Sequence, residues 1–158
     1  MSLVAVTTLG GPHLGASGRV IQGRARKMLA ALGLRGVELS IALVDDATIR
    51  DLNRRHRRKD KPTDVLSFHL QEIAPGETPK GALGDVVISV PTARRQAQKR
   101  RRPLLAELTM LLAHGLLHLV GFDHRTDAEE RDMVERTRGL ERAATTRLAP
   151  SRTKRRAR

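Results

Sequence analysis

The chain has no cysteine, tryptophan or tyrosine, and only two phenylalanines among its 158 residues. Without cysteine there are no disulfides and no thiolate metal ligands, so nitrogen and oxygen donors must hold any transition metal. With so few aromatic rings, base stacking would fall mainly to arginine guanidinium planes. Contacts to phosphate would then dominate any binding of nucleic acid.

A basic n-region is also missing at the N-terminus, so the sequence predicts no signal peptide. The longest apolar run, residues 103–122, is close to membrane-spanning length, but it contains Glu107 and two histidines. An acidic residue near the centre of a span costs roughly 3 kcal/mol on insertion scales. A buried core helix explains this run better, and we predict a cytoplasmic protein with no membrane partner.

Positive charge is abundant and clustered. Thirty Lys and Arg against seventeen Asp and Glu give a formal net charge of +13. Three clusters of six basic residues each lie at 54–61, 94–102 and 147–158. This pattern favours polyanionic partners, nucleic acid first and an anionic membrane surface second. Residues 150–158 have the composition of a disordered basic tail.

Hydrophobic periodicity and capping signals predict an alternation of strands and helices. Strands are expected at 3–8, 37–43, 64–70 and 85–90, with a loop at 73–84. Helices are expected after Ser17 up to Gly33, from about 47 to 55, after Pro91, from Pro103 to about 120, and after Thr126. We predict an α+β fold: a small mixed β-sheet packed with helices, in one domain over residues 1–149.

The candidate chemistry lies in the run HGLLHLVGFDH. His114 and His118 are four residues apart, so both imidazoles project from one face of the long helix. Gly121 can end this helix in a left-handed cap, and the returning chain brings His124 toward the other two. Three neutral nitrogens converging in this way predict a zinc site on the central helix, with one position left open.

This spacing is that of the metzincin peptidases, but those enzymes place a glutamate directly after the first histidine as general base. Here that position is Gly115, and the chain has no tyrosine to act as proton donor. Both absences argue against peptide hydrolysis by that mechanism.

The three-histidine run, together with LNRRHRRKDKPTDVLSF and LGDVVIS upstream, closely resembles the YbeY family of bacterial endoribonucleases and rRNA maturation factors. The resemblance extends over roughly Val37 to Met133. It departs from the family pattern at His56, where an aromatic residue is usual, and at Met110, where a further histidine is common.

The resemblance implies a zinc-dependent, single-strand-specific endoribonuclease acting in 16S rRNA 3′-end maturation and ribosome quality control. It implies ribosomal RNA, the small ribosomal subunit and its associated proteins as partners. The family's zinc ligands fall on His114, His118 and His124, with one Zn²⁺ per chain, and its conserved basic residue falls on Arg57.

Arg57 and His114 are the predicted catalytic residues. A zinc ion and a nearby guanidinium would stabilise the charge that develops on a phosphodiester in the transition state. Two alternatives stay open: a metal-dependent hydrolase of a peptide or amide, and a non-catalytic RNA-binding ribosome factor with a structural zinc. The second would require a fourth protein ligand, for example an aspartate or His69. Asp123 either orients a ligand imidazole or caps the turn, and Asp85 is expected to hydrogen-bond a loop. We assign no catalytic role to Glu107 and expect none for His13, His56 and His69.

Overall fold

The computed structural model describes residues 2–147, so the predicted basic tail at 150–158 lies outside the described residues. The order of elements is β1 (Leu3–Thr8), α1 (Gly18–Ala31), β2 (Val37–Val44), α2 (Asp46–Arg57), β3 (Val65–His69), β4 (Gly81–Ser89), α3 (Val90–Lys99), α4 (Leu104–Leu119) and α5 (Asp127–Thr145). The predicted α+β class is confirmed.

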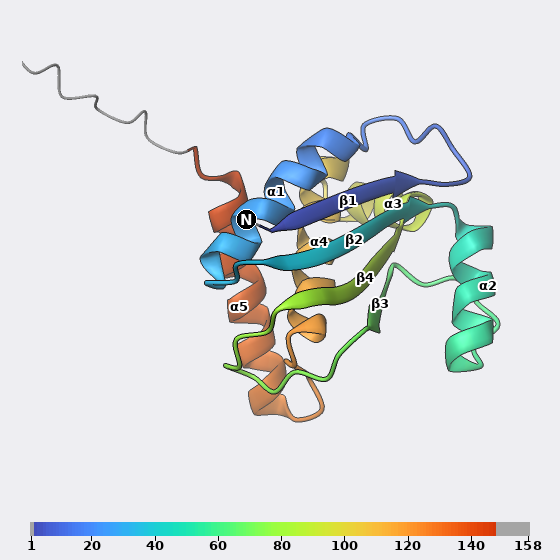
Figure 1. The fold of residues 1–158 in the computed structure, drawn as a ribbon. Coiled ribbons are helices and arrows are strands. Elements are labelled where there is room, and N and C mark those ends of the chain that lie inside the picture. The colour runs from blue at the N-terminus through green and yellow to red at the C-terminus, as the bar shows by residue number, and fades with distance from the viewer. Residues whose placement is uncertain (1, 148–158) are drawn as a thin grey trace, which may run out of the picture.

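All four strands belong to one mixed sheet with the order β1-β2-β4-β3. Strands β1, β2 and β4 run parallel, and β3 pairs antiparallel with β4 at one edge. Figure 1 shows α1, α4 and α5 gathered together on one side of the sheet, with α2 at a distance from α5. The main hydrophobic core lies between the sheet and this helical layer.

Alternate residues of a strand face opposite sides of the sheet, and the core reflects this. Val86 and Ile88 of β4 belong to the main core. Val87 lies between them and joins a second, smaller cluster with Ile49 of α2. Helix α2 therefore covers the opposite face of the sheet from α4, and it approaches the edge strand β3 from there.

Side-chain caps begin four of the five helices. Ser17, Asp45 and Thr126 accept hydrogen bonds from backbone N–H groups three residues ahead, as the sequence predicts. Ser89 does the same for α3. Helix α4 begins after Pro103, which precedes the helix instead of occupying its first turn and has no side-chain cap.

Two predicted boundaries were wrong by at least two residues. Strand β4 begins at Gly81 instead of Asp85, because residues 81–84 continue the pairing with β2 through a bulge. Asp85 therefore lies in the middle of the strand, opposite Phe68 of β3. Helix α2 continues to Arg57 instead of ending near 55, and Arg58 closes it in a left-handed conformation.

Most of α4 is buried, which accounts for its long apolar run. Within residues 2–147, none of the helices has both the length and the apolar character needed to cross a membrane. The last turns of α4 carry His114 and His118 and lie close to β3. The candidate site lies at this end of the helix.

Candidate metal centre

Three imidazoles come together at the C-terminal end of α4. His114 and His118 lie on successive turns of the helix, and His124 reaches them from the loop before α5. The Nε2 atoms of His114 and His118 are 3.1 Å apart. One nitrogen from each of the three rings lies within 4.8 Å of the others. The structure thus brings together the three histidines selected by their spacing in the sequence.

The turn that returns His124 depends on Gly121, whose φ is +98°. A Cβ atom at this position would lie 2.2 Å from the carbonyl oxygen of Ile73, so the close approach of the 73–74 loop also requires glycine. Asp123 then accepts a 2.8 Å hydrogen bond from the backbone N–H of His124 and pairs with Arg125. Asp123 thus orders the loop that carries the third imidazole.

The environment favours neutral imidazoles. Burial, with the neighbouring histidines, lowers the pKa of His118 from 6.5 to about 4. Burial followed by the charge of His124 also lowers the pKa of His114, against a smaller opposite effect of Asp64. Metal binding requires deprotonated nitrogen, so these shifts leave two ligands in the required state at neutral pH.

The cluster fits a metal ion. Two nitrogens bound tetrahedrally to one zinc at 2.0–2.1 Å would be roughly 3.3 Å apart, close to the separation of the His114 and His118 nitrogens. Among residues 2–147, no carboxylate and no further histidine joins the cluster. An ion held here would have three protein ligands and an open position, as in catalytic sites.

A hollow of about 480 Å³ opens over the three histidines, and we call it the β3 hollow. Arg57, at the last turn of α2, lies in its wall, and its guanidinium donates a 3.4 Å hydrogen bond to the carbonyl oxygen of Ser67. The two predicted catalytic residues, Arg57 and His114, therefore face the same hollow although they are far apart in the sequence.

Asn53 fixes the end of α2 on which Arg57 sits. Its side chain is almost fully buried and donates a 2.8 Å hydrogen bond to the carbonyl oxygen of Lys61. Its backbone carbonyl accepts from the N–H of Lys59. These bonds fold the basic loop back against the helix. Asn53 was missed in the sequence, although an asparagine on the inner face of a short amphipathic helix is a usable signal.

Residues of β3 connect the hollow to α4. The hydroxyl of Ser67 donates a 2.9 Å hydrogen bond to the carbonyl oxygen of Gly115. His69 Nε2 donates to the carbonyl oxygen of His118 at 2.8 Å. His69 thus contacts the backbone of a predicted ligand without joining the cluster. The sequence gives no sign of the role of Ser67, because a lone serine in a strand carries no recognisable pattern.

Asp64 is the other residue of this wall that the sequence did not reveal. It accepts a 2.8 Å hydrogen bond from the backbone N–H of Val65 and a 3.2 Å bond from the side chain of Gln96. Two histidines for which the sequence predicts no functional role also have partners in the structure. His13 contacts the carbonyl oxygen of Leu9, and His56 packs edge-on against Phe68.

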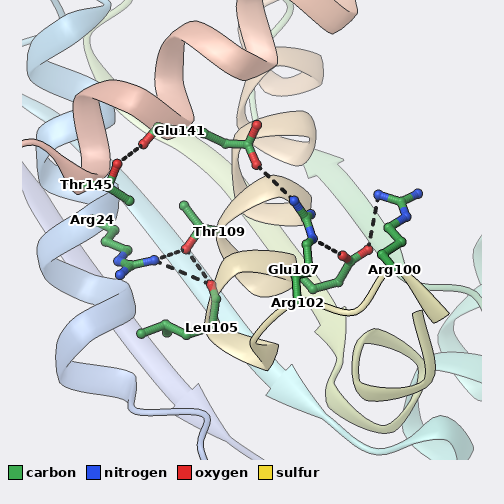
Figure 2. Close-up of polar contacts among 8 residues, drawn as sticks. All are labelled: Arg24, Arg100, Arg102, Leu105, Glu107, Thr109, Glu141 and Thr145. Atoms are coloured by element: carbon green, nitrogen blue, oxygen red, sulfur yellow. Dashed lines mark hydrogen bonds and ion pairs between the residues drawn. The ribbon is translucent and has the colours of Figure 1, made fainter. Parts of the chain in front are cut away.

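Glu107 is fully buried on α4 and has an ionic partner that the sequence did not predict. Arg102 Nε lies 2.7 Å from Glu107 Oε2, and Arg100 lies 3.5 Å from the other oxygen. Figure 2 shows Arg102 placed between Glu107 and Glu141 of α5. Glu107 lies outside the three-histidine cluster.

A mixed sheet packed against a helix, with three histidines at the end of that helix and in the loop after it, defines the class as an α+β protein able to hold a metal ion. The family profile described as Endoribonuclease YbeY matches residues 18–144. The chain belongs to this family.

Curated relatives of the same name support the assignment. An Endoribonuclease YbeY from Anaeromyxobacter sp. (strain Fw109-5) is 51% identical over 132 residues, covering 84% of this chain and 67% of the relative. The protein of that name from Moorella thermoacetica is 49% identical over 129 residues, covering 77% and 80%. Against the Anaeromyxobacter dehalogenans relative, the match spans 63% of the relative's length.

The fold is also found in a solved structure. The solution structure of a Thermotoga maritima protein superimposes with a TM-score of 0.62 over 88% of both chains, at 22% sequence identity. This similarity concerns the arrangement of helices and strands.

Proposed function

We propose that the chain is a zinc-dependent endoribonuclease that cleaves single-stranded RNA. The observation that carries this proposal is an open three-histidine cluster that shares one hollow with Arg57. The relatives' common name, Endoribonuclease YbeY, supports RNA as the substrate. The proposed task is 16S rRNA 3′-end maturation and ribosome quality control in the cytoplasm.

His114, His118 and His124 would hold the zinc ion. When bound, zinc supplies a Lewis acid that stabilises negative charge on a phosphoryl oxygen. Arg57 presents a fixed positive charge in the same hollow, where it binds and orients the phosphate and stabilises charge that grows toward the transition state. The Ser67 carbonyl, which accepts from Arg57, aims the guanidinium.

The peptidase alternative is disfavoured by packing. At Gly115, the position of the metzincin glutamate, a Cβ atom would lie 2.7 Å from Val86 Cγ1 and 3.1 Å from Ser67 Oγ. A side chain here would have to displace packed side chains of the sheet, so the position is unfavourable for a general base.

A purely structural zinc is disfavoured by the ligand count. A structural site is closed by a fourth protein ligand, whereas the three histidines are without one among residues 2–147. His69, the sequence candidate for that role, is engaged with the carbonyl oxygen of His118.

The positive charge of the chain supports a large anionic binding partner. The formal net charge is +13, and Arg57 and Arg125 both lie in the wall of the β3 hollow. Such a surface attracts the phosphate backbone irrespective of sequence. Ribosomal RNA, presented by the small subunit and its associated proteins, is the partner we propose.

Incubation of the zinc-loaded full chain with a single-stranded RNA, the same RNA in a duplex, and a peptide tests the proposal. We expect cleavage of the single strand alone, loss of cleavage with a chelator, and recovery on addition of zinc. Cleavage of the peptide, or an intact single strand in all conditions, would contradict it.

A further inference from the structure

A second hollow meets the histidine cluster between α4 and α5. It has a volume of about 380 Å³ and includes His114 and His124 in its wall, as the β3 hollow does. We call it the α4–α5 pocket. The proposed chemistry uses none of its other residues, and its size falls within the range of small-molecule sites, about 300–1,000 Å³.

Part of the wall is apolar. Met110 of α4 and Met133 of α5 lie in it, and Val134 adds an apolar side chain that is 45% exposed. Flexible thioether side chains adapt to flat or irregular partners. An apolar wall of this kind suits the face of a planar group.

The rest of the wall mixes donors and acceptors. Arg100, Arg102 and Arg138 can only donate hydrogen bonds, whereas Glu130 and Glu141 accept them when ionised. A phosphate brings acceptors alone and would place its charge beside two carboxylates. The edge of a nucleobase carries both donors and acceptors, so it satisfies both kinds of group.

Ionic contacts outside the pocket fix the polar side chains of its wall, as Figure 2 shows for Arg102 and Glu107. Arg102 is fixed by the fully buried Glu107 at 2.7 Å and faces Glu141 at 3.9 Å. Arg102 Nη2 is buried and has no hydrogen-bond partner within the described part of the chain. Burial raises the pKa of Glu141, as expected for a carboxyl group in a partly desolvated wall.

We propose that the α4–α5 pocket binds one unstacked nucleobase of the RNA, next to the phosphodiester that lies at the histidine cluster. This inference rests on the proposed ribonuclease function. Because the two hollows meet at His114 and His124, one strand crossing the cluster reaches both. Its phosphates then lie against Arg57, and one base turns in between α4 and α5. Single-stranded RNA is recognised in this way elsewhere, by bases splayed out of the stack.

Binding of a labelled 2′-O-methyl oligonucleotide, checked by gel to remain intact, tests the pocket. Each nucleotide in turn is replaced by one without a base, and fluorescence anisotropy gives the affinity of the full chain. We expect one position at which loss of the base weakens binding at least about fivefold, the lower end for one stacked base. Equal affinities at every position would overturn the inference.

A pair of variants locates the effect. Thr137 is buried in the pocket wall, and the variant Thr137→Leu places a larger side chain there. Thr145, on the same helix but outside the pocket wall, is changed in the control Thr145→Leu. We expect Thr137→Leu to remove the base dependence and Thr145→Leu to keep it. Base dependence retained in Thr137→Leu would contradict the assignment.

Cross-linking gives a measurement that needs no variant. A 4-thiouridine at the sensitive position should cross-link to residues 133–138 of α5, identified by mass spectrometry. Cross-links confined to elements other than α4 and α5 would overturn the pocket while leaving ribonuclease activity intact. A parent chain that neither binds nor cleaves single-stranded RNA would instead refute the proposed function, and the inference with it.

Discussion

The hydroxyl of Ser67 on β3 donates a 2.9 Å hydrogen bond to the carbonyl oxygen of Gly115, which directly follows the first histidine of the cluster. Gly115 has no side chain and packs against β3 and β4, where a Cβ atom would meet Val86 and Ser67. The distance between α4 and the sheet is therefore set beside His114, one turn before His118, and the cluster depends on this close approach.

Gly115→Ala should destabilise the fold by about 1–3 kcal/mol, the usual cost of overpacking a core. The added methyl group would lie 2.7 Å from Val86 Cγ1, which is closer than packed carbon atoms come, so α4 or the Val86 side chain would have to shift. Urea unfolding monitored by circular dichroism measures the change.

Gly23→Ala is the matched control. Gly23 also lies inside a helix, but a Cβ atom there would have no neighbour within 4 Å. Alanine is favoured over glycine in a helix by roughly 0.5–1 kcal/mol, so this variant should be slightly stabilised. Equal effects of the two substitutions would argue against tight packing at Gly115.

The convergence of the three histidines could be predicted because it depends on local geometry. Helical spacing aligns His114 with His118, and Gly121 supplies the reversal that returns His124. The contacts of Ser67 and Glu107 could not be predicted. Their partners are brought near by the packing of separate elements, which no short pattern encodes.

The two misplaced boundaries have different physical causes. Residues 73–84 are rich in Pro and Gly, which favours a loop, yet tertiary pairing with β2 extends the strand back to Gly81. Arg57 was expected in a basic loop because charge dominates that segment. The buried side chain of Asn53 holds it on the last turn of α2 instead.

Arg57→Ala should lower the rate of RNA cleavage about a hundredfold or more while leaving the zinc content unchanged, since loss of one preorganised electrostatic contact typically has this effect. Arg57 shares the hollow with the histidines but is not one of the cluster. Single-turnover cleavage and elemental analysis of the same preparation measure the two quantities.

Arg55→Ala provides the control for charge. Arg55 lies on the same helix, pairs with Asp51 at 3.1 Å and is outside the wall of the β3 hollow. Arg55→Ala removes the same formal charge as Arg57→Ala. Its effect on the cleavage rate should nevertheless be small and should shrink at higher salt. A parental cleavage rate in Arg57→Ala would refute the role of this residue.

Asp46 should make the stability of the fold depend on acid pH. Burial alone would raise the pKa of its carboxyl group, but hydrogen bonds from Ser89, Thr92 and Arg95 outweigh that effect and hold the pKa below 3.8. A depressed pKa in the folded state contributes stability above the unfolded value near 4, and this contribution is lost as pH falls through the folded value.

Asp46→Asn should therefore cost about 1–3 kcal/mol at pH 7, the scale of hydrogen bonds to a charged group. The difference from the parent should narrow steadily below pH 4. Asp132→Asn, which breaks an exposed pair with Arg136, should have little effect at either pH. Denaturant titrations at several pH values measure this, and a pH-independent difference for Asp46→Asn would contradict the argument.

The last prediction concerns the basic residues that follow Pro150, and it separates catalysis from delivery of the RNA. Residues 151–158 carry Arg152, Lys154, Arg155, Arg156 and Arg158, with no acidic residue among them. Each phosphate neutralised on a single strand changes the slope of log affinity against log salt by about −0.7. Replacing the five basic residues by glutamine keeps the length and should make that slope shallower by up to about three units. Zinc content and cleavage of a saturating short RNA should stay at the parental level, since none of the site residues lies in this segment. An unchanged slope would mean that these charges do not contact RNA, whereas loss of cleavage under saturation would mean that the site extends beyond the two hollows.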